Sequence, residues 1–223
     1  MFRTALLSLT FTLTAACSQA AIGAEKAVLA PAAQREAREA SGLKTAVFAG
    51  GCFWGVEGVF SYVPGVTSAV SGYHGGARAN ATYALIGRGT TGHAEAVRVT
   101  YDPAKVRYDQ LLRVFFSVVA DPTQLNRQGP DTGTQYRSAL VPLSEEQRQV
   151  AAAYLAQLSK ARLWPDPIVT KIEKYQQFYP AETYHQDFMA KNPRHPYILA
   201  WDAAKVAALK RLLPVHYKPG FTR

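Results

Sequence analysis

A run of six residues, 50–55, with the sequence Gly-Gly-Cys-Phe-Trp-Gly, constrains the fold of this chain more than any other stretch. The apolar bias of residues 44–49 predicts a short strand before it, and the apolar spacing over residues 53–63 predicts a helix after it. Cys52 therefore lies where a strand passes into a helix, and the two glycines permit the sharp turn. Backbone N–H groups and the positive end of the helix dipole would face the sulfur, lowering the pKa of the thiol and favouring the thiolate. This position favours a nucleophile over a small buried hydrophobe.

The same run resembles the Gly-Cys-Phe-Trp-Gly motif of the A-class peptide methionine sulfoxide reductases. Three further stretches resemble motifs of that family and follow in its order: residues 92–97 (Gly-His-Ala-Glu-Ala-Val), 131–138 (Asp-Thr-Gly-Thr-Gln-Tyr-Arg-Ser) and 181–186 (Ala-Glu-Thr-Tyr-His-Gln). Four matches in order are far more specific than one short motif. The resemblance implies an oxidoreductase that reduces methionine S-sulfoxide, free or in oxidised proteins, back to methionine. Cys52 would become a sulfenic acid during this repair.

The predicted elements favour an α+β fold, in which a mixed sheet packs against helices in one catalytic domain over residues 44–213. The resemblance implies a two-layer α/β sandwich of the plait type, and residues 214–223 would form a C-terminal tail. Hydrophobic spacing and turn residues place the further elements. We expect strands over residues 65–73, 93–101, 136–141 and 168–175, and helices over residues 108–120, 144–162, 183–191 and 201–213.

The first 20 residues have the features of an export signal. Arg3 supplies a positive end, and the apolar stretch 5–16 is too short to span a bilayer. Cleavage before Ala21 is one outcome, and lipid attachment at Cys17 after a stretch similar to a lipobox is the other. Residues 21–43 would then be a linker, weakly helical at most. We expect an exported protein, either periplasmic or membrane-anchored facing the periplasm.

Charge and composition exclude several other classes of protein. The net charge is +9 with a pI near 9.6, but Lys and Arg are scattered, which argues for a basic surface and against nucleic-acid binding. The five histidines are dispersed and no Cys-x-x-Cys pair exists, so we expect no metal site and no bound cofactor. The expected partners are oxidised proteins and a thiol reductant, and we expect the protein to be a monomer.

Glu95 is the first candidate proton donor. Residues 93–101 alternate as a strand, so Glu95 shares a face with Val97 and Val99. A carboxyl group on an apolar face is a candidate for a raised pKa, and a protonated carboxyl can donate to a departing oxygen. His93 precedes it on that face and is expected to hydrogen-bond locally.

The resemblance implies roles for further residues at positions that match its motifs. Phenol donors would assist Glu95, apolar rings would surround the sulfide methyl group, and an acid would orient the loop or the substrate. Two ring residues near the last motif would support the site without taking part in the chemistry. The phenol donors are Tyr83 and Tyr136, and the apolar rings are Phe53 and Trp54. The orienting acid is Asp131, and the supporting ring residues are His185 and Tyr184. One departure is Ala81, where the family usually has proline.

The chain has two cysteines, Cys17 and Cys52, whereas many members of the family carry extra cysteines near the C-terminus. Gly87 stands where some relatives have another one. Because thiol exchange needs an attacking sulfur within reach, we expect a one-cysteine cycle. An external thiol of the thioredoxin or glutaredoxin/glutathione type would reduce the sulfenic acid.

Two other classes of protein remain open on the residues alone. A papain-like cysteine hydrolase is suggested by His185, which follows Cys52 by about 130 residues. However, the Cys-Gly-Ser-Cys-Trp sequence that surrounds the cysteine in such hydrolases is absent from this chain. A peptidase assay with a thiol-alkylating inhibitor distinguishes this class. An exported binding lipoprotein would show no special reactivity at Cys52, which iodoacetamide labelling at pH 6 would reveal.

Overall fold

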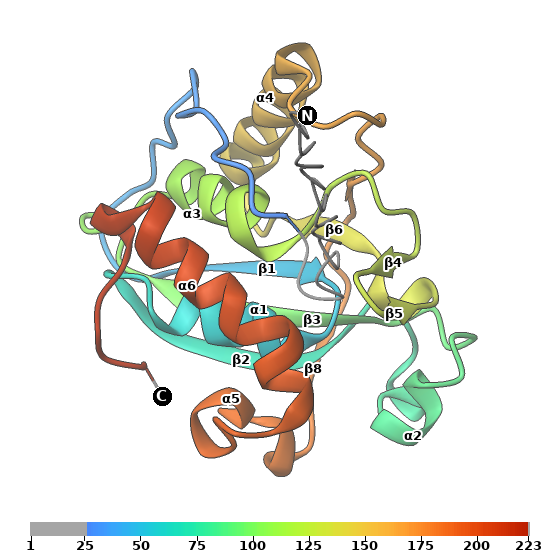
Figure 1. The fold of residues 1–223 in the computed structure, drawn as a ribbon. Coiled ribbons are helices and arrows are strands. Elements are labelled where there is room, and N and C mark those ends of the chain that lie inside the picture. Colours follow the sequence, from blue (N-terminus) through green and yellow to red (C-terminus); the bar gives the residue numbers. More distant parts are fainter. Residues whose placement is uncertain (1–25, 223) are drawn as a thin grey trace, which may run out of the picture.

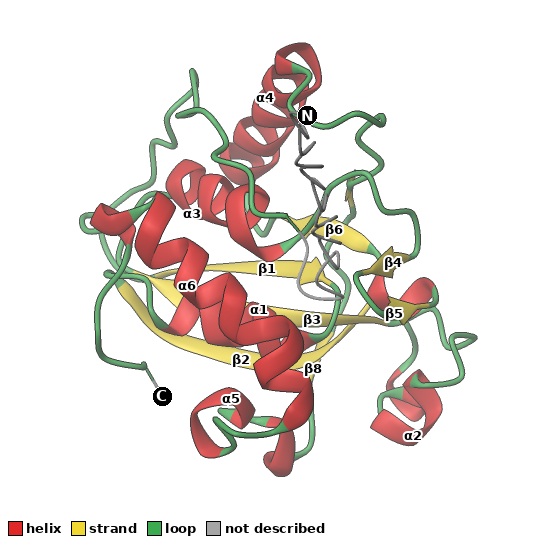
Figure 2. Ribbon diagram, viewed as in Figure 1, coloured by secondary structure: helices red, strands yellow, loops and turns green. Residues whose placement is uncertain are grey.

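The computed structural model describes residues 26–222, and its centre is a six-stranded sheet (Figures 1 and 2). Its strands, in the spatial order β7-β6-β1-β3-β2-β8, are β7 (Lys171–Ile172), β6 (Ser138–Val141), β1 (Lys44–Gly50), β3 (Ala94–Tyr101), β2 (Val66–His74) and β8 (Phe178–Pro180). Two short strands, β4 (Arg127–Gln128) and β5 (Asp131–Thr132), form a separate pair. All neighbours in the large sheet are antiparallel except β6 and β7, so the sheet is mixed.

Helices connect the central strands in the pattern of a plait. Helix α1 (Phe53–Ser61) joins β1 to β2, and α3 (Tyr108–Val114) lies between β3 and β6. The order β6-β1-β3-β2 with this β-α-β-β-α-β connectivity is the split βαβ arrangement. The expected α+β sandwich is confirmed.

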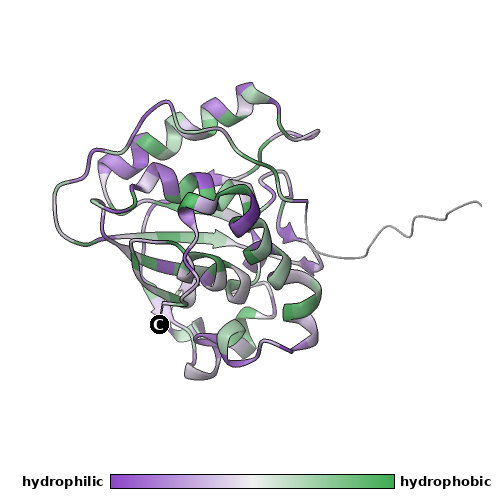
Figure 3. Cartoon of the chain, turned by 60° about the vertical axis from the view of Figure 1, so that its left-hand side comes forward, coloured by the Kyte–Doolittle hydropathy of each residue, from purple (hydrophilic) through white to green (hydrophobic). Residues whose placement is uncertain are grey.

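The longer helices cover one face of the sheet. Figure 1 shows α1, α3 and α6 (Ala203–Leu212) in front of the strands, while α4 (Glu145–Ala161) lies at the top and packs against α3. Two short helices, α2 (Tyr83–Ile86) and α5 (Phe188–Lys191), lie at the lower edge. Figure 3 shows hydrophilic residues along the outer side of α4 and mostly apolar colours in the strands behind the helices.

The alternation of β3 assigns each side chain to one of two apolar clusters. Val97, Val99 and Tyr101 are buried in the large cluster under the helices, and Ala94 and Ala96 belong to a smaller cluster on the opposite face. The predicted assignment of faces is therefore confirmed, because the pleat of a strand has a period of two residues.

Several predicted elements are shorter or interrupted. The strand expected over residues 168–175 is reduced to β7, since the backbone N–H groups of Val169 and Thr170 donate to Pro122 and leave the sheet. The helix expected over residues 183–191 is divided by Asp187, whose φ of 55° is left-handed. A π-helical turn, Ile198–Asp202, precedes α6, and another, Phe115–Val119, follows α3. Tyr136 lies in a 3-10 turn, Thr134–Tyr136, so its strand begins later.

Residues 26–43, which we call the N-terminal strap, differ most from the expectation. The sequence predicts a linker, but the strap, which has no regular secondary structure, packs along the domain with Ala30 and Ala37 buried. The Ala30 N–H donates to Ser117 Oγ at 3.0 Å, and the Ala37 N–H donates to Asp109 Oδ1 at 2.9 Å. The linker prediction is wrong for this part, because side chains of the domain satisfy the backbone of the strap.

The expected export signal, the candidate lipid site at Cys17 and residues 21–25 lie outside the described residues. Within residues 26–222, no helix has the length and apolar character needed to cross a membrane.

Candidate active site

Cys52 occupies the turn between β1 and α1, as the sequence predicts, and it is half-buried. Gly51 has a φ of +88°, a conformation that favours glycine, and a Cβ there would collide with the Gln128 side chain. Gln128 is buried and bonded through its amide to the Asp121 N–H and carbonyl. The glycine turn therefore lets the loop that carries Asp131 press closely against the nucleophile.

The electrostatics at Cys52 differ from the expectation. Burial raises the pKa of the Cys52 thiol well above its ordinary value, and the carboxyls of Glu95, Asp202 and Asp131 add to this. A hydrogen bond from the backbone N–H of Trp54 lowers the pKa but does not outweigh these effects. The predicted lowering of the pKa is therefore wrong, because burial and the neighbouring acids outweigh the start of the helix. The backbone N–H of Phe53, the first residue of α1, donates to Glu95 Oε2 at 3.0 Å instead of to the sulfur.

Glu95 is buried directly below this turn. Its side chain is 2% exposed, and burial raises its pKa to about 8, with the Phe53 N–H partly offsetting the effect. The carboxyl is therefore mostly protonated at neutral pH, which confirms the raised pKa expected from its place on an apolar strand face. A neutral acid and a neutral thiol thus lie at one site, with the carboxyl close enough to raise the pKa of the thiol.

Tyr83 and Tyr136 approach the same site from separate segments. Tyr83 begins α2, and Tyr136 ends the 3-10 turn before β6. Burial, together with the charges of Glu95 and Cys52, raises the pKa of Tyr83 to about 12. Burial also raises the pKa of Tyr136, with added effects from Glu95, Asp131 and Cys52. Both phenols stay protonated at neutral pH and can donate hydrogen bonds.

The opposite side of Cys52 is formed by the C-terminal segment. A narrow depression beside the thiol is lined by Gln128, Gly129, Pro130, Asp131, Tyr197, Trp201, Asp202 and Lys205. The Tyr197 hydroxyl donates to Asp131 Oδ2 through a short hydrogen bond, and burial raises the pKa of Asp131. Asp131 was expected here from the sequence, whereas Tyr197 and Asp202 were not.

One signal could have found Asp202. A Cβ at Gly55 would collide with the Asp202 carboxyl, so the glycine in the motif marks a close approach. Nothing in the sequence pattern distinguishes Tyr197 from the other tyrosines.

Aromatic rings form a wall beside the nucleophile. Trp54 stacks on Phe188 with ring centroids 3.7 Å apart, and its indole N–H donates to His185 Nδ1 at 3.1 Å. His185 is buried and packs 4.9 Å from the Phe53 ring. Tyr184 is 61% exposed and contacts the outer side of His185. The structure thus brings together all the residues that the sequence analysis named as site candidates, with Tyr184 at the rim.

The comparison with known proteins identifies the family. Residues 44–213 match the family model described as peptide methionine sulfoxide reductase, which covers more than half of the chain. The chain belongs to the peptide methionine sulfoxide reductase family. It is therefore an oxidoreductase that acts on a sulfur group. The matched range coincides with the catalytic domain expected from the sequence.

Relatives in several organisms resemble this reductase over most of their length. It is 59% identical over 180 residues to "Peptide methionine sulfoxide reductase MsrA 2" of Mesorhizobium japonicum, covering 81% of this chain and 92% of the relative. It is 50% identical over 166 residues to MsrA of Deinococcus radiodurans, covering 74% and 80%. The crystal structure of reduced Mxr1 from Saccharomyces cerevisiae superposes with a TM-score of 0.59 at 33% identity, covering 72% and 91%. Methionine sulfoxide reductase A of Corynebacterium diphtheriae gives 0.59 at 34%, covering 78% and 90%.

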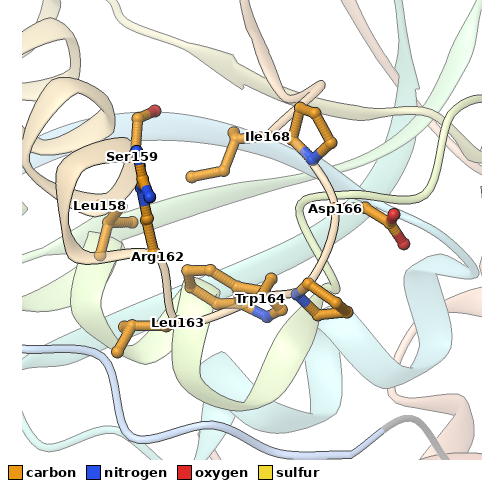
Figure 4. Close-up of a pocket in the computed structure, with 9 residues that line it drawn as sticks. Leu158, Ser159, Arg162, Leu163, Trp164, Asp166 and Ile168 are labelled. Carbon is orange, nitrogen blue, oxygen red and sulfur yellow. The ribbon is translucent and has the colours of Figure 1, made fainter.

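Two larger hollows in the reductase are lined by none of the site residues described above. The hollow in Figure 4 has a volume of about 510 Å³ and lies between the end of α4 and the chain that follows it, with Trp164 and Ile168 on its wall. A second, of about 580 Å³, lies between the start of α4 and residues 172–175. Neither is lined by a cysteine. Across residues 26–222, no group of three His, Cys, Asp or Glu side chains is arranged to hold a metal ion.

Proposed function

We propose that this reductase converts the S epimer of methionine sulfoxide, free or within oxidised proteins, to methionine by attack of Cys52 on the sulfoxide sulfur. The observation that carries the proposal is the pairing of Cys52 with Glu95, whose pKa near 8 keeps a proton available beside the nucleophile. Reduction of a sulfoxide needs both a nucleophile at sulfur and a proton for the oxygen.

The atoms and electrons balance in one transfer. The Cys52 sulfur bonds to the sulfoxide sulfur and releases its proton, while Glu95 protonates the sulfoxide oxygen. The hydroxyl group then passes to the Cys52 sulfur as the bond between the two sulfurs breaks. Methionine leaves with two more electrons, Cys52 becomes a sulfenic acid, and the released thiol proton restores Glu95.

The two tyrosines assist at the oxygen. Because the phenols of Tyr83 and Tyr136 remain protonated, they donate hydrogen bonds to the sulfoxide oxygen as negative charge develops on it. This role is supported by their electrostatic coupling to both Glu95 and Cys52.

The aromatic wall accounts for recognition of the methyl group. Phe53 is buried and Trp54 is half-buried beside the thiol, so together they offer an apolar surface to a sulfide methyl. Asp131, held by Tyr197, orients the substrate on the other side. His185 and Tyr184 support the indole and the rim without taking part in the chemistry.

The enzyme resets by an external thiol. Cys52 is the one cysteine of the catalytic domain, and no sulfur from residues 44–222 can reach it to form a disulfide. A thioredoxin or a glutathione and glutaredoxin system would attack the sulfenic acid and release water.

The proposed setting is the exported one. An export signal over residues 1–20 would be either cleaved before Ala21 or followed by lipid attachment at Cys17. The enzyme would then be in the periplasm or anchored to a membrane facing it. Oxidised exported proteins would then be its substrates, and we propose that it acts as a monomer.

The hydrolase alternative loses its main support. The Nδ1 atom of His185 accepts the Trp54 indole N–H, and its buried Nε2 atom makes no hydrogen bond to Cys52, so within residues 26–222 the structure contains no Cys–His pair of the kind a cysteine hydrolase needs.

The test is turnover of peptides that carry either the S or the R epimer of methionine sulfoxide, with dithiothreitol as reductant. We expect turnover of the S epimer alone. Cys52→Ser should abolish it, because a hydroxyl oxygen attacks sulfur far more poorly than a thiol and cannot take up the oxygen as a sulfenic acid. Activity of the variant above about one hundredth of the wild-type rate would contradict the proposal, since covalent chemistry cannot then depend on this atom.

A further inference from the structure

Glu182 joins three elements around Tyr83. It lies just after β8, and its Oε2 accepts the hydroxyl of Tyr73, a buried residue of β2, at 2.7 Å. Its Oε1 accepts the backbone N–H of Tyr83 at 2.9 Å. One carboxylate thus connects the sheet, the segment after β8 and the residue that carries a proposed proton donor.

The segment around Tyr83 has few other attachments. Ile86 is buried, but most side chains of residues 78–88 are exposed, and Thr82 gives α2 no side-chain cap. In the described part of the chain, the hydrogen bonds of residues 78–88 are local, within residues 77–89, with one exception. That exception is the bond from the Tyr83 N–H to Glu182. The ends of the segment are held separately, since the Ala77 carbonyl bonds to His93 Nε2 at 3.0 Å and the Gly89 carbonyl accepts the Thr134 hydroxyl at 2.7 Å. Glu182 therefore fixes the Tyr83 backbone between these two anchors.

Packing fixes the phenol ring only from one side. The Tyr83 ring contacts His185 with centroids 4.3 Å apart and Phe53 at 6.5 Å, while 37% of the residue is exposed. A ring that is packed on one side and exposed on the other can swing with its backbone.

We propose that Glu182 is a positioning residue for the reductase, and that it holds the Tyr83 hydroxyl at the sulfoxide oxygen through its hydrogen bonds to the Tyr83 backbone and the Tyr73 phenol. This inference rests on the proton-donor role of Tyr83 proposed above. Misplacement of a catalytic group by about 1 Å can cost up to 100-fold in rate, so such a tether has a measurable effect.

The carboxylate suits this role because it accepts two hydrogen bonds at fixed angles. Burial alone would raise its pKa, but the bonds from the Tyr83 N–H and the Tyr73 hydroxyl outweigh burial and lower it. Glu182 therefore remains an acceptor for both groups at neutral pH. A glutamine could keep both contacts, because its oxygen can accept the N–H while its amide donates to the Tyr73 oxygen.

The first experiment compares single variants by kcat/KM for an S-sulfoxide peptide. Glu182→Ala should lower it about 10-fold, and Glu182→Gln should remain within about threefold of wild type. The matched control is Glu146→Ala, because Glu146 also accepts a backbone N–H, from Arg38 at 2.9 Å, but does so on the strap side of the molecule. The control should leave turnover unchanged. Thermal unfolding of each variant reports folding.

The second experiment separates positioning from general damage. In a Tyr83→Phe background, Glu182→Ala should cost less than about twofold, because the hydroxyl it positions is absent. In a Tyr136→Phe background, where Tyr83 is the remaining phenol, the cost should be about 10-fold or more. If Glu182→Ala folds poorly, Tyr73→Phe serves instead. It frees Oε2 but keeps the Tyr83 contact, so a smaller loss should show the same dependence on the Tyr83 hydroxyl.

An equal loss in both backgrounds would overturn the inference, as would an unchanged kcat/KM in Glu182→Ala. Failure of the proposed function appears elsewhere. Residual turnover in Cys52→Ser would contradict the mechanism itself. A combined Tyr83→Phe and Tyr136→Phe variant with undiminished activity would contradict the donor role, whatever Glu182 does.

Discussion

Cys52 and Glu95 start the reaction in their protonated forms. Burial raises the pKa of both groups, and the Glu95 carboxyl raises the pKa of Cys52 further. Because the reaction leaves a sulfenic acid and requires a protonated oxygen, a site with both protons already in place needs no supply from solvent before the transfer.

The pH dependence follows from the carboxyl. As pH rises through about 8, Glu95 loses its proton and with it the ability to donate, so kcat/KM should fall above that pH. Glu95→Gln should lower kcat/KM by about 100-fold or more and remove the descending limb near pH 8. The measurement is kcat/KM from pH 6 to 10 for both proteins. A variant within threefold of wild type that keeps the same limb would contradict this role.

The raised pKa of Glu95 could be predicted from the sequence, whereas the raised pKa of Cys52 could not. The alternation of β3 is local, so the face of Glu95 could be read from neighbouring residues. The thiol pKa depends on the total burial and on Asp202, which is 150 residues away in the chain. Such distant contributions have no local pattern.

At the scale of elements, α1 is shaped by its neighbours through two glycines. Gly55 faces the Asp202 carboxyl, and Gly58 faces the end of the Met189 side chain. Alanine is intrinsically better than glycine in a helix, so any loss on substitution reflects the contact and not the helix.

We predict opposite outcomes for these two glycines. Gly55→Ala should push the Asp202 carboxyl out of place beside Cys52 and lower kcat/KM at least 10-fold, because a buried side chain has little room to move. Gly58→Ala is the control, since the flexible Met189 can rotate away. Activity and melting temperature of both variants provide the measurement. Equal activity would show that Asp202 does not constrain the helix.

The elements themselves were predicted unevenly. The strands and helices with strong periodicity, such as β3 and α4, occur where the sequence places them, with α4 capped by Ser144. The segments near the C-terminus were harder, because a π-helical turn precedes α6 and a left-handed Asp187 interrupts the previous helix. Both irregularities depend on tertiary packing rather than on residue spacing.

At the scale of the whole molecule, the catalytic domain has one cysteine to oxidise. We predict that the sulfenic acid at Cys52 persists after one turnover without reductant, and that dimedone traps it there, as detected by mass spectrometry. Cys52→Ser is the control and should take up no label. A disulfide between Cys17 and Cys52 that forms as fast as turnover would exclude this cycle.

The strap should contribute to stability and not to catalysis. Its backbone bonds to Ser117, Asp109 and Glu146 are each worth about 1 kcal/mol, reduced by the cost of ordering the segment. Removal of residues 26–43 should lower the melting temperature by about 5–10 °C. The kcat of the folded protein should stay within twofold of wild type, because the strap does not line the depression beside Cys52. An unchanged melting temperature would show that the packing adds nothing.

The strap also sets an order of events while the chain is made. Its partners lie far downstream in the sequence: Ser117 Oγ accepts the Ala30 N–H, and Gln157 Oε1 accepts the Gln34 N–H at 2.9 Å. A ribosome releases the N-terminus first, so the strap emerges long before the surface on which it rests. The partners of residues 26–43 are complete only when Gln157 has been made, after Asp109 and Ser117. Docking of the strap is thus a late step that follows synthesis of most of the domain.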